Sequence, residues 1–158
     1  MNTRKIVVNI SDAKASNCST DILATYSLGS CIAVCLYDDI ARAGGLLHYQ
    51  LPDSSLHPER AVNKPFMFAD TGLKKLYDRM VLLGATKRNI HVTIAGGASI
   101  DIAPKGFDIG KRNHLAIRKL MWRLGLRIGN EDVGGDRPRN VYLDIATGNV
   151  SIKTCRAG

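Results

Sequence analysis

The sequence predicts an α+β fold, a single-domain α/β sandwich in which two main helices cover one side of a mainly antiparallel or mixed sheet. Short apolar or alternating runs fill the first third of the chain, two later segments carry apolar residues at helical spacing, and the end returns to strand-like runs. A chain of 158 residues, 45% of them hydrophobic, is long enough to bury a core. We therefore expect one domain over residues 1–158.

The predicted strands of the first third are bounded by Asp, Ser, Asn or Gly, which favour turns. They cover residues 5–10, 22–26, 31–37 and 45–51. A helix is expected at 66–83, with Pro65 near its start and Gly84 just past its end. Residues 52–64, between the last strand and this helix, show little pattern and are expected to form a loop.

The second half begins with a predicted strand at 90–95, which stops at two glycines, and a second weakly patterned stretch at 98–107. A second amphipathic helix is expected at 109–124, ending at Gly125. Three further strands are predicted at 126–128, 140–145 and 150–154, the last two joined by a tight turn, Thr-Gly-Asn. The resulting order is β-β-β-β-α-β-α-β-β-β.

Charge and cysteine usage restrict the partners and the compartment. Lys and Arg total 22 against 14 Asp and Glu, so a net charge of +8 favours nucleic acid, an anionic membrane surface or an acidic protein. Aromatics make up only 6% of the residues, which weakens the nucleic-acid interpretation because single-strand binders stack bases on aromatic rings. No run approaches the roughly 20 apolar residues of a membrane span, and four scattered cysteines fit free thiols. We expect a cytoplasmic protein with no membrane insertion.

The sharpest local motif is LGSC at residues 28–31, a glycine turn that leads into an apolar strand. Backbone N–H groups near the thiol can hold an oxyanion beside Cys31, and we assign this substrate and oxyanion loop to Ser27, Gly29 and Ser30. His48 ends a neighbouring strand-like run and can take the thiol proton if the two strands pair. A strand cysteine is commonly inert packing and a strand histidine is commonly a satisfied core residue, so residue types alone leave both interpretations open. Cys35 has no glycine turn and is assigned to packing.

A zinc site built from Cys31, Cys35 and His48 is rejected on geometry. Residues four apart on a strand lie about 13 Å apart, whereas zinc ligands lie about 2 Å from the ion. The other histidines have no partners at ligand spacing. We expect no metal and no cofactor.

Several motifs, in this order, resemble one known family over nearly the whole chain. They are LGSC at 28–31, GGLLHYQLP at 44–52, FADT at 68–71, AGGA at 95–98, IGKRN at 109–113 and DVGG at 132–135, followed by Arg139. The sequence resembles the CheD family, chemoreceptor glutamine deamidases of bacterial and archaeal chemotaxis. The resemblance implies an α/β sandwich related to papain-like hydrolases and to cytotoxic necrotizing factor toxins.

The resemblance also implies a cysteine nucleophile, a histidine base and a supporting threonine, which fall on Cys31, His48 and Thr25. Ser27 stands where some relatives have glycine, and either hydroxyl, that of Thr25 or that of Ser27, can orient the imidazole. Amide chemistry then gives a thioester intermediate and release of ammonia. The implied partners are the cytoplasmic domains of chemoreceptors, as substrate, and the CheC phosphatase. Methylesterase activity on receptor glutamyl esters, and a non-catalytic docking module that regulates CheC and receptors, remain open alternatives.

Overall fold

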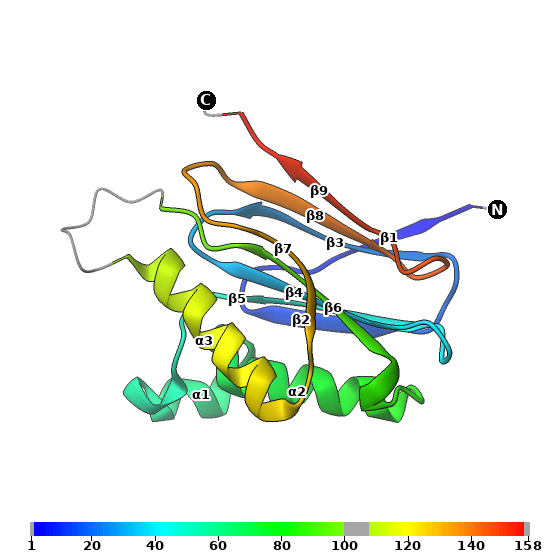
Figure 1. Ribbon diagram of the computed structural model, residues 1–158, viewed down its shortest axis with the longest axis horizontal. Helices are drawn as coiled ribbons and strands as arrows, with labels where there is room; N and C mark the ends of the chain where they lie inside the picture. The colour runs from blue at the N-terminus through cyan, green and yellow to red at the C-terminus, as the bar shows by residue number, and fades with distance from the viewer. Residues whose placement is uncertain (1, 100–107, 157–158) are drawn as a thin grey trace.

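The computed structural model describes residues 2–99 and 108–156 and arranges them in three layers (Figure 1). The outer sheet has the order β1 (Arg4–Val7), β3 (Asp21–Leu28), β8 (Arg139–Asp144), β9 (Val150–Thr154). The central sheet has the order β2 (Asp12–Ser16), β5 (Ala43–Tyr49), β4 (Ile32–Asp38), β6 (Ile90–Gly96), β7 (Ile128–Val133). Helices α2 (Ala69–Leu82) and α3 (Ile109–Leu124) cover the far face of the central sheet.

Both sheets are mixed. The pairs β1–β3 and β6–β7 are parallel, and every other named pair is antiparallel. The predicted α+β class, with mixed pairing and two main helices, is confirmed. The strands divide between two stacked sheets, so the central sheet has apolar neighbours on both of its faces.

Strand β4 lies at the centre of this arrangement and is buried at every position. Its even-numbered residues Ile32, Val34 and Leu36 pack toward the helices, while Ala33, Cys35 and Tyr37 pack toward the outer sheet. A strand covered on both faces is apolar throughout rather than alternating, which explains its sequence. Cys35 is a buried core residue, in agreement with its predicted packing role.

Both predicted helices are confirmed. Helix α2 is preceded by short turns η1 (Ser54–Leu56) and η2 (Pro65–Met67) and by α1 (Pro58–Asn63), so the segment expected to be a plain loop contains helical turns. Helix α3 ends at Gly125, whose φ of 79° is the left-handed conformation that glycine adopts at helix ends. Another short turn, η3 (Lys87–Asn89), precedes β6. Of the second predicted loop, 98–107, residues 100–107 lie outside the described residues. No described helix combines the length and the hydrophobicity needed to cross a bilayer.

The strand predicted at 5–10 is only partly confirmed. Strand β1 ends at Val7, and the chain then crosses from the outer sheet to the central sheet, where β2 pairs with β5. Two backbone hydrogen bonds mark the crossing: Val8 N–H donates to Ala24 in the outer sheet, and Ser11 N–H donates to His48 in the central sheet. The final predicted strand pair is confirmed, while the strand expected at 126–128 begins at Ile128 and continues to Val133.

Candidate active site

The three residues assigned to chemistry lie on neighbouring strands at one end of the sandwich. Cys31 directly precedes β4, His48 lies on β5, and Thr25 lies on β3 of the facing sheet. In the β4–β5 ladder, His48 is opposite Ala33. Cys31 is two residues from Ala33 and so points to the same face, which makes it a diagonal neighbour of His48 at about 7–8 Å between Cα atoms.

Thr25, Cys31 and His48 line a common pocket of about 310 Å³. The rest of its wall is the crossing segment and the bend of β3: Val7, Val8, Asn9, Ile10, Tyr26 and Ser27. Cys31 is half-buried, so its sulfur is not sealed in the interior. The chain segment that leaves the outer sheet therefore encloses the thiol and the imidazole together.

The hydrogen bonds of Thr25 fix the tautomer of His48. The Thr25 hydroxyl donates its single proton to the carbonyl oxygen of Val8, at 2.7 Å. Its oxygen also lies 2.7 Å from His48 Nδ1, and because its proton is already used it accepts a hydrogen bond from that nitrogen. Nδ1 therefore carries the ring proton, and Nε2 of the neutral ring carries a lone pair.

The environment keeps this ring neutral. Burial lowers the pKa of His48 from 6.5 to about 4, although the nearby Asp12 carboxylate raises it in opposition. Nε2 is buried and has no hydrogen-bond partner among the described residues. An unpaired buried acceptor costs on the order of 1–3 kcal/mol and is therefore rare in cores. In this pocket it is a base without a bound proton.

Burial also keeps the thiol protonated. It raises the pKa of Cys31 from 9.0 to about 11, while the backbone N–H of the same residue lowers the pKa in opposition. The two groups that line this pocket are therefore a neutral thiol and a neutral imidazole rather than an ion pair.

Residues 29–31, which we call the thiol loop, are held from behind through their carbonyl groups. The carbonyl of Gly29 accepts from Ala98 N–H, and that of Cys31 accepts from Gly97 N–H, each at 2.9 Å. The carbonyl of Ser30 accepts from the side chain of Asn113. The three N–H groups of the thiol loop have no recorded backbone partner among the described residues.

Asn113 supports the candidate site, although the sequence analysis gave it no role beyond the motif IGKRN at 109–113. It is fully buried, and its side-chain nitrogen donates to Ser30 O at 2.9 Å and to Gln50 O at 2.8 Å. Ser30 adjoins Cys31, and Gln50 lies two residues after His48, so a single amide links both halves of the pair to helix α3. The available signal was a polar residue on the buried stripe of that helix, one turn before Ile117.

The two glycines after β6 permit this close packing. Gly96 has a φ of 111°, and a Cβ at that position would clash with the carbonyl oxygen of Cys31. Its own carbonyl accepts from Gly134 N–H at 2.9 Å and from the Arg139 guanidinium at 3.3 Å. Gly96 and Gly97 therefore lie directly behind the thiol loop, and Gly134 is bonded to Gly96.

Ser27 has a different place from Thr25. Its backbone has a φ of 56°, the left-handed region, at an irregularity in the β3–β8 pairing. Its N–H donates to the side chain of Asn140 at 2.9 Å. Of the two hydroxyls considered, it is that of Thr25 that contacts the imidazole. Ser27 lines the pocket without a recorded contact to His48.

The candidate site offers one thiol and one imidazole, which is too few ligands for a structural or catalytic zinc ion. Within residues 2–99 and 108–156, no three side chains of His, Cys, Asp or Glu gather as metal ligands would.

Comparison with known proteins places the chain in a family. The family model described as CheD chemotactic sensory transduction matches residues 50–154. A relative from Syntrophus aciditrophicus (strain SB), named "Probable chemoreceptor glutamine deamidase CheD 1", is 48% identical over 149 residues, which are 94% of this chain and 93% of the relative. The chain belongs to the CheD family. The resemblance inferred from the motifs is thereby confirmed.

A second relative and one solved structure are also similar to this chain. A CheD relative from Solibacter usitatus (strain Ellin6076), named "Probable chemoreceptor glutamine deamidase CheD", is 44% identical over 92% of this chain and 86% of its own length. The solved structure of Neisseria meningitidis protein NMB0706 covers 84% of this chain and 63% of its own, with 11% identity and a TM-score of 0.47. The CheD family model begins just after His48, so Cys31 and His48 are assigned on the geometry of this structure and on the motifs.

Proposed function

We propose that this chain is a protein-glutamine glutaminase, a cysteine hydrolase that converts specific chemoreceptor glutamines to glutamate and releases ammonia. The observation that carries the chemistry is the Thr25–His48 hydrogen bond, which leaves Nε2 as a proton acceptor in the pocket that Cys31 also lines. The substrate class comes from the CheD relatives, which are named as chemoreceptor glutamine deamidases. Bacterial chemotaxis and a cytoplasmic location are parts of the same proposal.

The first half of the reaction forms a thioester. The Cys31 sulfur attacks the side-chain carbonyl carbon of glutamine while its proton moves to His48 Nε2. The carbon–nitrogen bond then breaks, and the same proton passes from Nε2 to the departing nitrogen, which leaves as ammonia. Thr25 holds the ring in the tautomer that this transfer requires.

The second half consumes water. Nε2 takes a proton from a water molecule as its oxygen attacks the thioester carbon, and the carbon–sulfur bond breaks with return of that proton to the sulfur. The product is a glutamic acid side chain, which ionises at neutral pH and gives the receptor one more negative charge. The N–H groups of the thiol loop, at Gly29, Ser30 and Cys31, stabilise the oxyanion in both halves.

Two finer parts of the proposal follow from the same acyl chemistry and from the family resemblance. A glutamyl methyl ester fits the same mechanism with methanol as leaving group, which would make the chain a receptor methylesterase as well. The CheC phosphatase is the proposed second partner and shares the pocket around Cys31 with the receptor. Receptor deamidation that persists undiminished in excess CheC would exclude a shared pocket.

The deciding experiment incubates the protein with a receptor cytoplasmic fragment and locates mass gains of about one dalton at glutamine, since deamidation replaces an amide by an acid. We expect Cys31→Ala to abolish the gain while receptor binding persists. Cys35→Ala is the matched control, because this buried thiol packs between the sheets and should affect stability only. A protein that only docks would show no gain in the wild type, and activity in the Cys31→Ala variant would refute the nucleophile.

A further inference from the structure

Helix α3 carries a surface that the catalytic pocket does not use. Its basic residues are Lys111, Arg112, Arg118, Lys119 and Arg123, and it contains no Asp or Glu. Arg118, Lys119 and Arg123 form no recorded ion pair among the described residues. In the part of the chain that the structure describes, no carboxylate is therefore bonded directly to these three cations.

Large apolar side chains lie among these cations. Trp122 is 83% exposed and Leu115 is 53% exposed. They are seven residues apart on α3, which places them on one stripe about 10 Å long, with Arg118 and Lys119 between them. A charged helix face that is merely solvated has no need of an exposed tryptophan, and Trp and Arg are the residues most enriched at binding hot spots.

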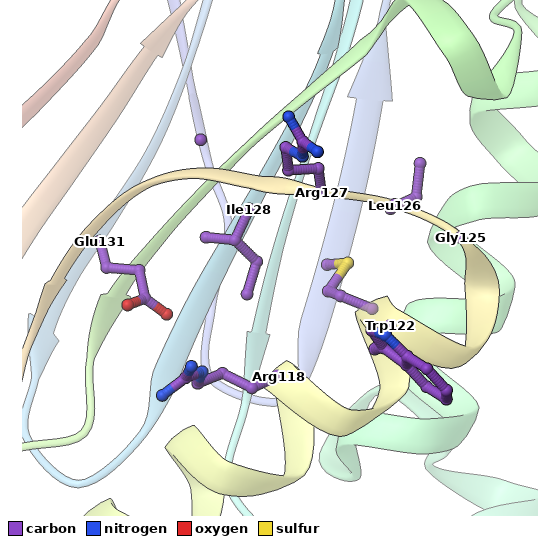
Figure 2. Close-up of a pocket in the computed structure, with 9 residues that line it drawn as sticks. Arg118, Trp122, Gly125, Leu126, Arg127, Ile128 and Glu131 are labelled. Carbon is purple, nitrogen blue, oxygen red and sulfur yellow. The ribbon is translucent and has the colours of Figure 1, made fainter.

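Grooves flank this stripe on both sides. One, of about 750 Å³, lies between α3 and β7, and Figure 2 shows Arg118 and Trp122 on its helix side and Ile128 and Glu131 on its strand side. The other, of about 540 Å³, lies between α3 and the η1 turn, where Leu56 is 71% exposed. The stripe with its two grooves can therefore receive more than a single side chain.

We propose that Leu115, Arg118, Lys119, Trp122 and Arg123, which we call the α3 face, dock an acidic helical segment of the protein that carries the substrate glutamine. Charge complementarity selects an acidic partner, since no ion pair to Arg118, Lys119 or Arg123 is recorded within residues 2–99 and 108–156 and the whole chain carries +8. The anchors recur at the spacing by which one helix packs along another. This inference rests on the proposed function for the identity of the partner.

A protein fits the α3 face better than an anionic membrane. Carboxylates stand in the groove walls: Glu131 lines the first groove, and Asp53 and Asp70 line the second. Lipid headgroups that entered either groove would meet these like charges, whereas a protein segment can place a basic side chain opposite each one.

The α3 face is also connected to chemistry. It begins one turn or less beyond Asn113, which holds the thiol loop and the end of β5. Trp122 lies about 13 Å from Asn113 along the helix axis. A partner helix packed on this face is therefore fixed at a set distance from Cys31, and this distance selects which glutamines reach the pocket.

Trp122 reports on its own surface because it is the single tryptophan of the chain. The test titrates the full-length Cys31→Ala protein, which does not turn over, with a receptor cytoplasmic fragment whose tryptophans are replaced by phenylalanine. We expect a saturable shift of Trp122 emission to shorter wavelength, weakened by salt. In this titration, the added double substitution Arg118→Glu/Lys119→Glu should weaken binding about tenfold or more. In the active protein, which keeps Cys31, the same double substitution should raise KM for the receptor fragment more than KM for a short glutamine peptide.

The matched control is Lys5→Glu/Lys153→Glu, the same change of charge on the outer sheet, where both lysines flank Tyr142. If both double variants weaken fragment binding equally, the attraction comes from overall charge, and docking on the α3 face is refuted. An emission shift with anionic vesicles but not with the fragment would overturn it in favour of a membrane. If the wild type deamidates the fragment normally but Trp122 emission does not shift, the docking surface alone is refuted. If Trp122 emission shifts specifically with the fragment but the wild type does not deamidate it, the proposed function alone is refuted.

Discussion

The buried imidazole of His48 makes stability depend on pH in a defined window. Burial holds its pKa at about 4 in the folded protein, against 6.5 for a free histidine. Between these two values the unfolded chain binds a proton that the folded protein does not bind, so the free energy of unfolding rises with pH. The contribution is fully present above pH 6.5 and is lost as pH falls to about 4.

The size of this contribution follows from the same two values. A difference of about 2.5 pKa units corresponds to about 3 kcal/mol, at 1.36 kcal/mol per unit. This is a large fraction of the roughly 5–15 kcal/mol that stabilises an ordinary domain. His48 is 4% exposed, so solvent screening reduces the figure little.

The perturbation is His48→Asn, measured by urea unfolding at several pH values from 4 to 7.5. The asparagine amide takes the place of Nδ1 as donor to Thr25 and does not titrate. We expect the variant to be less stable than wild type at pH 7, and to lose about 3 kcal/mol less than wild type on going to pH 4.

His91→Asn is the control, because His91 is exposed and pairs only loosely with Asp39, at 3.6 Å. The free energy of unfolding of this variant should depend on pH as steeply as that of the wild type, because His48 is retained. The reasoning is refuted if wild type and His48→Asn lose the same stability between pH 6.5 and pH 4. Such a result would mean that the folded protein binds a proton at His48 as readily as the unfolded chain does.

Three other substitutions test residues that hold Cys31 and His48 in place. Thr25→Val keeps shape but removes the acceptor for Nδ1, so kcat for ammonia release should fall roughly 10- to 100-fold with little change in KM, and Thr25→Ser should restore it. Asn113→Ala leaves two carbonyl groups unpaired and should lower the free energy of unfolding by about 2–4 kcal/mol, against less than about 0.5 kcal/mol for exposed Leu115→Ala. Gly96→Ala should abolish deamidation, whereas Gly84→Ala, at a similar φ but with only an ordinary contact to Ala41 at 3.9 Å, should only reduce urea stability.

The local parts of the site could be predicted from the sequence. The glycine turn before Cys31 and the apolar run after it are short-range signals, and β4 and β5 are consecutive strands, which usually pair. Once they pair, two-residue periodicity alone brings Cys31 and His48 to one face. Placing these two side chains in one pocket therefore needed only one correct pairing.

The division into two sheets could not be predicted in the same way. Alternation shows that a strand buries one face, but it does not show against which sheet. Strand β2 has the sequence DAKAS, and its alanines give too weak an apolar pattern to mark a strand. It forms because it pairs along the edge of β5, and that pairing depends on the crossing after Val7.

Asn113 shows the same limit at the level of a side chain. Its position on the buried stripe of α3 signals a polar group that needs partners. Those partners, the carbonyls of Ser30 and Gln50, are 83 and 63 positions away in the sequence. Periodicity carries no information about contacts of that range.

The neutral resting state of Cys31 and His48 bears on selectivity. Because burial raises the pKa of Cys31 to about 11, the thiol is protonated at pH 7, and a small electrophile that needs a preformed thiolate reacts slowly. Under the proposed mechanism, Nε2 removes the proton only as the sulfur attacks a carbonyl held beside it. The reaction rate then depends on how well a substrate is positioned rather than on how reactive the free thiol is. An enzyme that works by this proposed mechanism gains most from a docking surface outside the pocket, which is the role proposed for the α3 face.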